Sequence, residues 1–238
     1  MTEIYHVLNR GVDKRTIFLD EQDHFRFIHD LYEFNNEDPV LNFNYFLVRN
    51  KSIDKSIDVR RRYGKESQPR KLIVDIHAFC LMPNHYHLMI SPRVDKGIPL
   101  FMKKLNGGYA KYFNEKYERS GALFQGRYKS IVVTEEHHFI HLPYYIHCNP
   151  LDIISEQWRA KKMNDRKSAI NFLESYRWSS HLDYLGKKNF PSVISDDFLQ
   201  SYFGGKLAYK NSIYTWLKNF DSENVSLVDL ESIDVRHR

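Results

Sequence analysis

His85 and His87, separated by one residue, are the pair in this sequence best placed to bind a metal ion. They lie in a stretch, Ile73 to Ser91, whose pattern predicts a β-strand, a Met-Pro-Asn turn and a second strand. Side chains at i and i+2 of a strand point to the same face, so both imidazoles can reach one ion. The alternative interpretation is an ordinary surface histidine pair, because this spacing also arises by chance.

Tyr145 and Asn149 add a nucleophile and a ligand near the end of a later predicted helix, just before Pro150. Four residues apart, they project from the same helical face. Two imidazoles and one amide oxygen leave most of a coordination sphere open, which suits Mg²⁺ or Mn²⁺ acting on a phosphate better than a closed zinc site. The four side chains together predict a site for phosphodiester cleavage. Asn149 before a proline is also an ordinary helix stop.

Several residues compete for these roles. Tyr109 and Tyr112, on an earlier predicted helix, are the strongest rival nucleophiles among 16 tyrosines. His137 and His141 have the spacing of a zinc protease, but the general-base glutamate is missing between them, although a zinc-binding pair stays open. Cys80 lies in an apolar strand without an adjacent base, which indicates a core residue.

Composition predicts a globular chain, with 238 residues and 42% hydrophobic content, enough for one well-buried domain plus an extension or for two small domains. No apolar run of membrane-spanning length occurs, and the N-terminal residues lack a signal-peptide pattern. Two cysteines are too few for a disulfide framework and suit a reducing cytoplasm.

The net charge of +5 is unevenly distributed. Residues 49–71 hold nine Lys or Arg against three Asp or Glu, and residues 103–129 hold seven against two. The tail, residues 221–238, holds five acids against two bases. Basic blocks interleaved with Tyr and Phe favour a polyanionic partner, with a solvated surface as the alternative.

Hydrophobic periodicity predicts alternating strands and helices. The predicted elements are a strand at 4–8, a helix from Glu21 to about Phe34 capped by Asp20, strands at 72–80 and 85–91, a helix at 99–117, a strand at 123–133 and a helix at 135–148 with Pro143 as a kink or late start. This order predicts an α+β fold, an antiparallel sheet with helices packed on one side.

Two further segments complete the predicted organisation. A polar insertion over 35–70, with Arg60, Arg61 and Arg62 as its most basic point, has room for a short strand at 44–49. Beyond Pro150 the pattern predicts short helices at 171–178, 196–203 and 210–220. We therefore divide the chain into a catalytic domain, 1–151, and a helical C-terminal extension with an acidic tail, 152–238.

Short motifs in a characteristic order resemble the single-tyrosine HUH transposases, close to the REP-associated tyrosine transposases of bacteria. The resemblance covers roughly 4–151 and continues weakly through Trp178-Ser179-Ser180 and Tyr184-Leu185-Gly186. The motifs are Tyr5-His6-Val7, Asn9-Arg10-Gly11, Met82-Pro83-Asn84-His85-Tyr86-His87, Tyr112-Phe113-Asn114, Gly121-Ala122-Leu123-Phe124-Gln125-Gly126-Arg127-Tyr128-Lys129 and Tyr145-Ile146-His147-Cys148-Asn149-Pro150.

The resemblance implies a ferredoxin-like catalytic domain, the HUH endonuclease fold, that cleaves and rejoins single-stranded DNA. His85 and His87 match the metal-binding pair, Tyr145 the nucleophile and Asn149 the polar third ligand. The implied reaction gives a 5′-phosphotyrosine and a free 3′-hydroxyl, with Mg²⁺ or Mn²⁺ as cofactor. It also implies a bacterial cytoplasmic protein, at the nucleoid when bound to DNA.

The implied partner is single-stranded DNA with a hairpin, and either a homodimer or a monomer is compatible with the resemblance. Our candidates for phosphate contacts are Arg10, Arg60, Arg61, Arg62, Arg127 and Lys129. Two alternatives stay open. One is a domesticated hairpin-binding protein without turnover, and the other is a metal nuclease that activates water and leaves Tyr145 structural.

Overall fold

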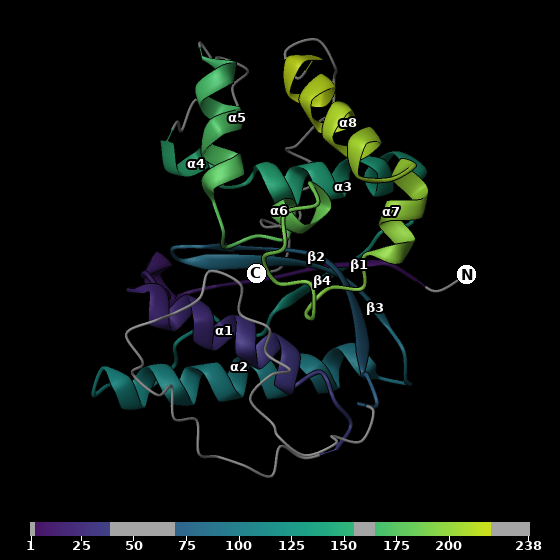
Figure 1. The fold of residues 1–238 in the computed structure, drawn as a ribbon. Coiled ribbons are helices and arrows are strands. Elements are labelled where there is room, and N and C mark those ends of the chain that lie inside the picture. Colours follow the sequence, from purple (N-terminus) through teal and green to yellow (C-terminus); the bar gives the residue numbers. More distant parts are fainter. Residues whose placement is uncertain (1–2, 39–69, 155–164, 220–238) are drawn as a thin grey trace.

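The computed structural model describes residues 3–38, 70–154 and 165–219. Its centre is a four-stranded antiparallel sheet (Figure 1), in the order β2-β3-β1-β4. The strands are β1 (Tyr5–Arg10), β2 (Val74–Met82), β3 (His85–Pro92) and β4 (Lys129–Val132). Helix α1 (Glu21–Glu33) connects β1 to β2, and α2 (Gly97–Lys116) connects β3 to β4. This βαββαβ order with this strand arrangement is ferredoxin-like, which confirms the predicted α+β class.

Helices α1 and α2 cover one face of the sheet. The predicted cap of α1 is present, because the Asp20 side chain accepts a hydrogen bond from the Asp23 backbone N–H. Tyr86 of β3 points into this layer, with its ring 4.8 Å from that of Phe27 and its hydroxyl donating to Asn106 of α2 at 2.6 Å. The strand neighbours of Tyr86 therefore point to the opposite face.

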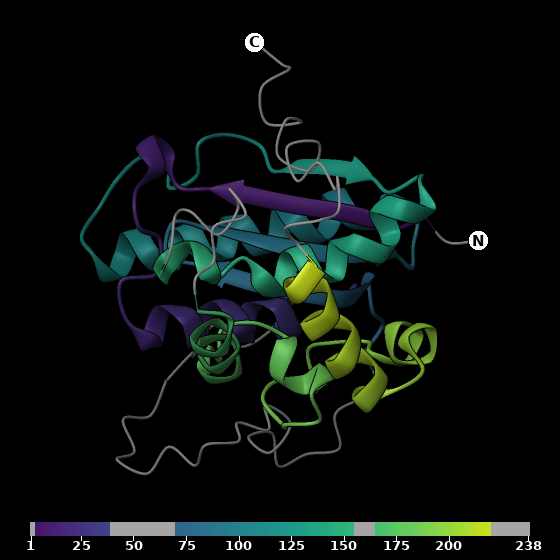
Figure 2. The ribbon, with the colours of Figure 1, turned by 90° about the horizontal axis from the view of Figure 1, so that it is seen from above.

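The opposite face is covered by α3 (Glu136–Cys148) and by the C-terminal helices. Figure 2 looks down on this face, with the yellow α8 lying over the sheet. The C-terminal helices are α4 (Leu151–Ile154), α5 (Arg166–Ser175), α6 (His181–Tyr184), α7 (Asp197–Phe203) and α8 (Lys206–Asn219). The prediction of helices on one side only was wrong. Strand β3 is buried on both faces up to its last residue, so both faces need a cover.

The predicted strand at 123–133 is much shorter in the structure. Regular pairing with β1 covers only β4, and Phe124 makes a single isolated bridge with Gly11. Between them the Gln125 N–H donates to the Arg10 carbonyl at 2.8 Å, which ties this segment to the end of β1 as a loop. The sequence pattern therefore located the segment correctly but overestimated its regularity.

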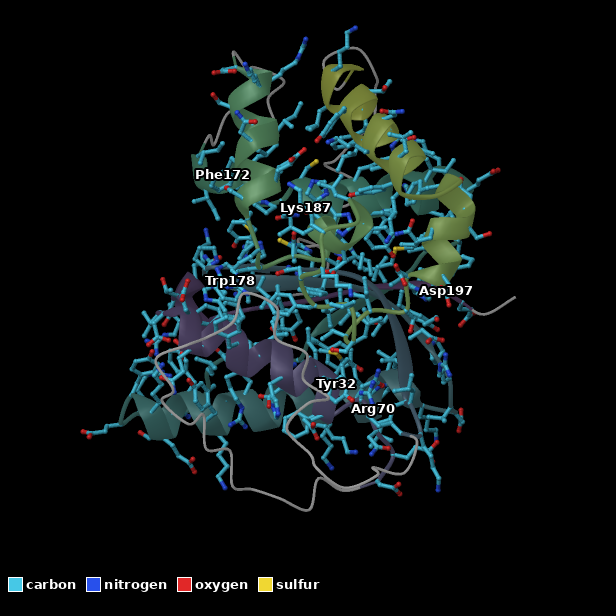
Figure 3. The ribbon with its side chains drawn as sticks, viewed as in Figure 1. Tyr32, Arg70, Phe172, Trp178, Lys187 and Asp197 are labelled. Carbon is cyan, nitrogen blue, oxygen red and sulfur yellow. The ribbon has the colours of Figure 1, made fainter. Side chains whose placement is uncertain are left out.

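The C-terminal segment packs along the outer edge of β2. The Leu81 N–H donates to the Trp178 carbonyl at 2.8 Å, and the Ser195 N–H donates to the Ile76 carbonyl at 2.8 Å. Figure 3 shows Trp178 at the junction between the α1 layer and the helices above the sheet. This segment satisfies backbone groups of β2 that would otherwise form an open sheet edge. The division of the chain into a catalytic domain, 1–151, and a C-terminal extension, 152–238, stays a proposal.

The predicted insertion falls largely outside the described residues. Its two ends meet near the C-terminal end of α1, where the Glu37 N–H donates to the Lys71 carbonyl at 2.9 Å. Arg70 stacks over Tyr32 at 3.6 Å from the ring centroid (Figure 3). The short strand predicted at 44–49, the arginines at 60–62 and the acidic tail lie outside the described residues. Among the helices that the structure describes, none is long and apolar enough to cross a membrane.

Candidate active site

Strand β3 places His85 and His87 on the face of the sheet that α3 covers. Strand pairing sets Arg10 opposite His85 and Leu8 opposite His87, and residues paired in this way share a face. The two imidazole centroids are 5.0 Å apart, and only 8% of His85 and 4% of His87 is exposed. The predicted pair is thus a buried one, which removes the interpretation as a surface histidine pair.

Helix α3 brings Tyr145 to these histidines. Its ring lies edge-on to His87 with centroids 5.5 Å apart, and only 2% of the residue is exposed. The adjacent Tyr144 points elsewhere and packs against Phe203 and Trp216 of the C-terminal helices. The helical rotation between neighbouring residues therefore selects Tyr145 as the tyrosine of α3 that faces the histidine pair.

Asn149 ends α3 and lies fully buried below Tyr145. Its side-chain Nδ2 donates to the Tyr145 carbonyl at 3.2 Å, so the amide is turned back onto the turn of helix that carries Tyr145. The Oδ1 atom is then the part of this amide with the chemistry of a metal ligand. Asn149 thus combines its expected role as a helix stop with a position one turn from Tyr145.

A neighbouring side chain holds the Nδ1 atom of each histidine. His85 Nδ1 lies 2.6 Å from Asn84 Oδ1, and His87 Nδ1 lies 2.9 Å from His6 Nε2. Metal-binding histidines commonly use one ring nitrogen for the ion and hold the other in such a hydrogen bond. The donor set therefore fits a divalent ion bound through the two Nε2 atoms. Within the described residues no group of three or more His, Cys, Asp or Glu side chains is placed to hold a metal.

His6 of β1 lies in the Tyr5-His6-Val7 motif, but the sequence analysis gave it no role in the site. Its ring stacks on His87 at 5.1 Å between centroids and meets the edge of Tyr145 at 5.9 Å. Burial lowers the pKa of His6 to about 4, so the ring is neutral at pH 7. Its partner is 81 residues away in sequence, so no local spacing could have revealed it. The available signal was a lone histidine within a strand that pairs with the histidine strand.

Basic side chains lie beside the histidines. Arg10 pairs with His85 across the strands, and Lys129 of β4 pairs with Leu8 on the same face. The pKa of Lys129 is lowered, first by burial and then by the charge of Arg10, which indicates that these two cations are close. Arg127 is exposed just before β4. Two neighbouring cations favour an anion such as phosphate at this position.

The rival nucleophiles lie on the wrong side of the sheet. Tyr109 and Tyr112 belong to α2, which covers the face opposite to His85 and His87. The Tyr109 hydroxyl donates to the Ile17 carbonyl, and the Tyr112 hydroxyl donates to Asp23 at 3.0 Å. Both hydroxyls therefore have structural roles within the α1–α2 layer.

The other competing groups also have structural positions. The rings of His137 and His141 lie 4.7 Å apart near the start of α3, and His141 Nδ1 accepts a hydrogen bond from Trp216 Nε1 at 2.9 Å. Within the described part of the chain this pair has no third ligand placed for zinc. Cys80 is fully buried, and burial raises the pKa of its thiol, as expected for a core residue.

No curated protein matches the chain. A solved structure of the REP-associated tyrosine transposase bound to a REP hairpin is 12% identical, with 83% of this chain and 88% of that chain covered and a TM-score of 0.43. A solved putative transposase from Deinococcus radiodurans R1 is 16% identical, with 61% and 90% covered and a TM-score of 0.35.

Both TM-scores are below 0.5, so the similarity to a protein family rests on the sequence match. The family model described as "Transposase IS200 like" matches residues 45–149. The matched stretch contains the histidine pair, Tyr145 and Asn149, and it ends at Asn149. Residues 45–149 of this chain are therefore similar to the IS200-like transposase family.

Proposed function

We propose that this protein is a metal-dependent single-stranded DNA endonuclease and strand transferase that uses Tyr145 as its nucleophile. The observation that carries the proposal is the meeting of His85, His87 and Tyr145, from β3 and α3, on one face of the sheet. The match to a transposase family supports the reaction class. Its substrate would be DNA with a hairpin beside the cleaved strand.

In this proposal the Tyr145 oxygen attacks a scissile phosphorus. The bond from phosphorus to the 3′-oxygen breaks, the phenol proton is lost, and the leaving 3′-oxygen gains a proton. The products are a 5′-phosphotyrosine and a free 3′-hydroxyl, and attack by another 3′-hydroxyl reverses the step for strand transfer. A bound Mg²⁺ or Mn²⁺ would supply Lewis-acid stabilisation of the charge on the phosphate.

The protein side chains contribute positioning and charge. Helix α3 carries Tyr145 and Asn149 on one face, so the nucleophile and the proposed amide ligand move together. Arg10 and Lys129 would hold the phosphodiester backbone next to His85. Arg127 would extend this contact, and Arg60, Arg61 and Arg62 would add to it from the insertion. One chain brings the histidines and Tyr145 together, so the proposal is compatible with a monomer and with a homodimer.

Covalent capture tests the proposal. The full chain would be incubated with labelled single-stranded hairpin DNA from the flanks of its own gene, with and without Mn²⁺. We expect an adduct that resists denaturation, requires Mn²⁺ and is absent from Tyr145→Phe. Tyr144→Phe is the matched control, because the neighbouring tyrosine faces the C-terminal helices, and it should form the adduct normally.

The two alternatives give different results in the same experiment. A water-activating nuclease would cleave without an adduct, would lose activity in His87→Ala and would keep it in Tyr145→Phe. A domesticated binding protein would bind the hairpins tightly with neither cleavage nor adduct across several flanking substrates. Either result would contradict the proposed function.

A further inference from the structure

The turn between β2 and β3 carries a side chain with two defined hydrogen-bond partners. Asn84 Oδ1 lies 2.6 Å from His85 Nδ1, and Asn84 Nδ2 donates to the Lys14 carbonyl at 3.1 Å. One amide therefore connects a proposed metal ligand on the sheet to the loop that follows β1. Asn84 and Lys14 are 70 residues apart in sequence, so the fold, and not the local sequence, brings them together.

These two contacts together fix where the proton of His85 lies. The Lys14 carbonyl can only accept a hydrogen bond, so the amide atom that faces it must be the –NH₂ group. The other amide atom, which faces His85, is then the oxygen and can only accept. His85 Nδ1 must therefore carry a hydrogen, and a neutral His85 has its lone pair on Nε2, the atom needed for a metal ion.

The loop at the other end of this connection has a strained backbone. Asp13 and Lys14 both adopt left-handed conformations, with φ of 54° and 57°, which costs free energy for residues other than glycine. A Cβ atom on Gly11 would lie 2.4 Å from the Arg15 carbonyl oxygen, so only glycine fits there.

Backbone bonds pin the same loop to the same turn. The Gly11 N–H donates to the Asn84 carbonyl at 2.8 Å, and the Ile17 N–H donates to the Pro83 carbonyl at 2.8 Å. The exposed Lys14 and the partly exposed Arg15 thus have their backbone fixed relative to His85. Strained backbone that its surroundings hold in place is a common feature of functional sites.

We propose that Asn84 is a positioning residue, which holds a neutral His85 with its hydrogen on Nδ1 and its lone pair on Nε2, the proposed metal-binding atom, and which fixes the basic loop 11–15 against that histidine. The proposal rests on the proposed function for the role of His85 as a ligand. It adds that the orientation of the ligand is set before the ion binds, by the hydrogen bond from His85 to Asn84.

Two variants separate the hydrogen bond from the shape of the side chain. Asn84→Leu has a similar size and accepts no hydrogen bond, whereas Asn84→Asp keeps an acceptor for His85 Nδ1. The first readout is the protonation of the ring nitrogens in the full-length, metal-free protein, by proton–nitrogen correlation NMR of labelled histidine at neutral pH. We expect Nδ1-protonated His85 in the native protein and in Asn84→Asp, and a mixture of tautomers in Asn84→Leu.

The second readout is Mn²⁺ affinity by calorimetry. Loss of such a supporting residue typically weakens metal binding about 10- to 100-fold, and we expect this for Asn84→Leu but not for Asn84→Asp. Asn114→Leu is the matched control. The Asn114 amide also makes two hydrogen bonds, donating to the Gly121 carbonyl and accepting from the Arg119 side chain. It lies at the end of α2, so its loss should change neither readout.

The outcomes distinguish this inference from the proposed function. Nε2-protonated His85 in the native protein would overturn the inference even if Asn84→Leu failed to fold. Unchanged tautomer and Mn²⁺ affinity in a folded Asn84→Leu would also overturn it. If His85→Ala binds Mn²⁺ as tightly as the native protein, the proposed metal site fails, and the NMR result alone then decides whether Asn84 orients His85.

Discussion

His6 touches both the proposed ligand His87 and the proposed nucleophile Tyr145, so its hydrogen bond is the residue-scale feature most open to test. In His6→Phe an aromatic ring of similar width stays in the stack, but His87 Nδ1 loses its partner. We expect Mn²⁺ affinity, measured by calorimetry, to fall about 10-fold or more while the fold is kept. His77→Phe is the control, because that buried histidine of the same sheet bonds to Ser91. Equal losses in both variants would contradict a specific role for His6.

Among the site residues, only those related by a regular spacing in the sequence could be predicted. The pair His85 and His87 follows from the two-residue repeat of a strand, and Tyr145 with Asn149 follows from the four-residue repeat of a helix. The contacts of His6 with His87 and of Asn84 with Lys14 depend on strand register and on a loop conformation, which no repeat encodes.

Helix α3 depends on its surroundings to hold Tyr145 in place. Pro143 lies inside the helix and has no N–H to donate to the preceding turn. A buried network supports the helix near its end. His147 Nδ1 lies 2.7 Å from the Tyr209 hydroxyl, and that hydroxyl lies 2.8 Å from His181 Nδ1. Burial lowers the pKa of both histidines, so the network joins α3, α6 and α8 without charge.

Removing one oxygen atom from this network should loosen the nucleophile helix. Tyr209→Phe leaves the Nδ1 atoms of His147 and His181 without their hydroxyl partner, and each such loss costs about 1–3 kcal/mol. We expect a lower free energy of unfolding in urea and slower adduct formation. Tyr202→Phe, at a residue 45% exposed on α7, should change neither quantity. Native stability in Tyr209→Phe would contradict this account of α3.

Element order was predictable because apolar repeats mark most of the strands and helices before residue 151, outside the polar insertion at 35–70. The second helical layer was not predictable from the sequence. The run of apolar residues and histidines in β3 has the same pattern whether one face of the strand or both faces are buried. The C-terminal residues that cover the edge of β2 bond to its backbone groups, as the Trp178 carbonyl does, and the backbone of a strand leaves no trace in the side-chain pattern.

At the scale of the whole molecule, the basic residues next to the histidines should control DNA affinity. We expect Arg10→Gln and Lys129→Gln each to weaken binding of single-stranded hairpin DNA to a similar extent for all sequences. Each should also reduce the slope of log affinity against log salt by roughly 0.7, measured by fluorescence anisotropy. Lys103→Gln, an exposed cation of α2 on the far side of the sheet, should leave the slope unchanged. An equal change in all three variants would show that charge acts without regard to position.

The most direct test of the central claim is to locate the covalent DNA adduct by fragmentation mass spectrometry. The native protein would be treated with its flanking hairpin DNA and Mn²⁺ and digested, and the modified peptide would be sequenced through Tyr144 and Tyr145. We predict a phosphodiester link from the Tyr145 oxygen to a DNA 5′-phosphate. A link at any other residue, or cleaved DNA without a link to protein, would contradict the account.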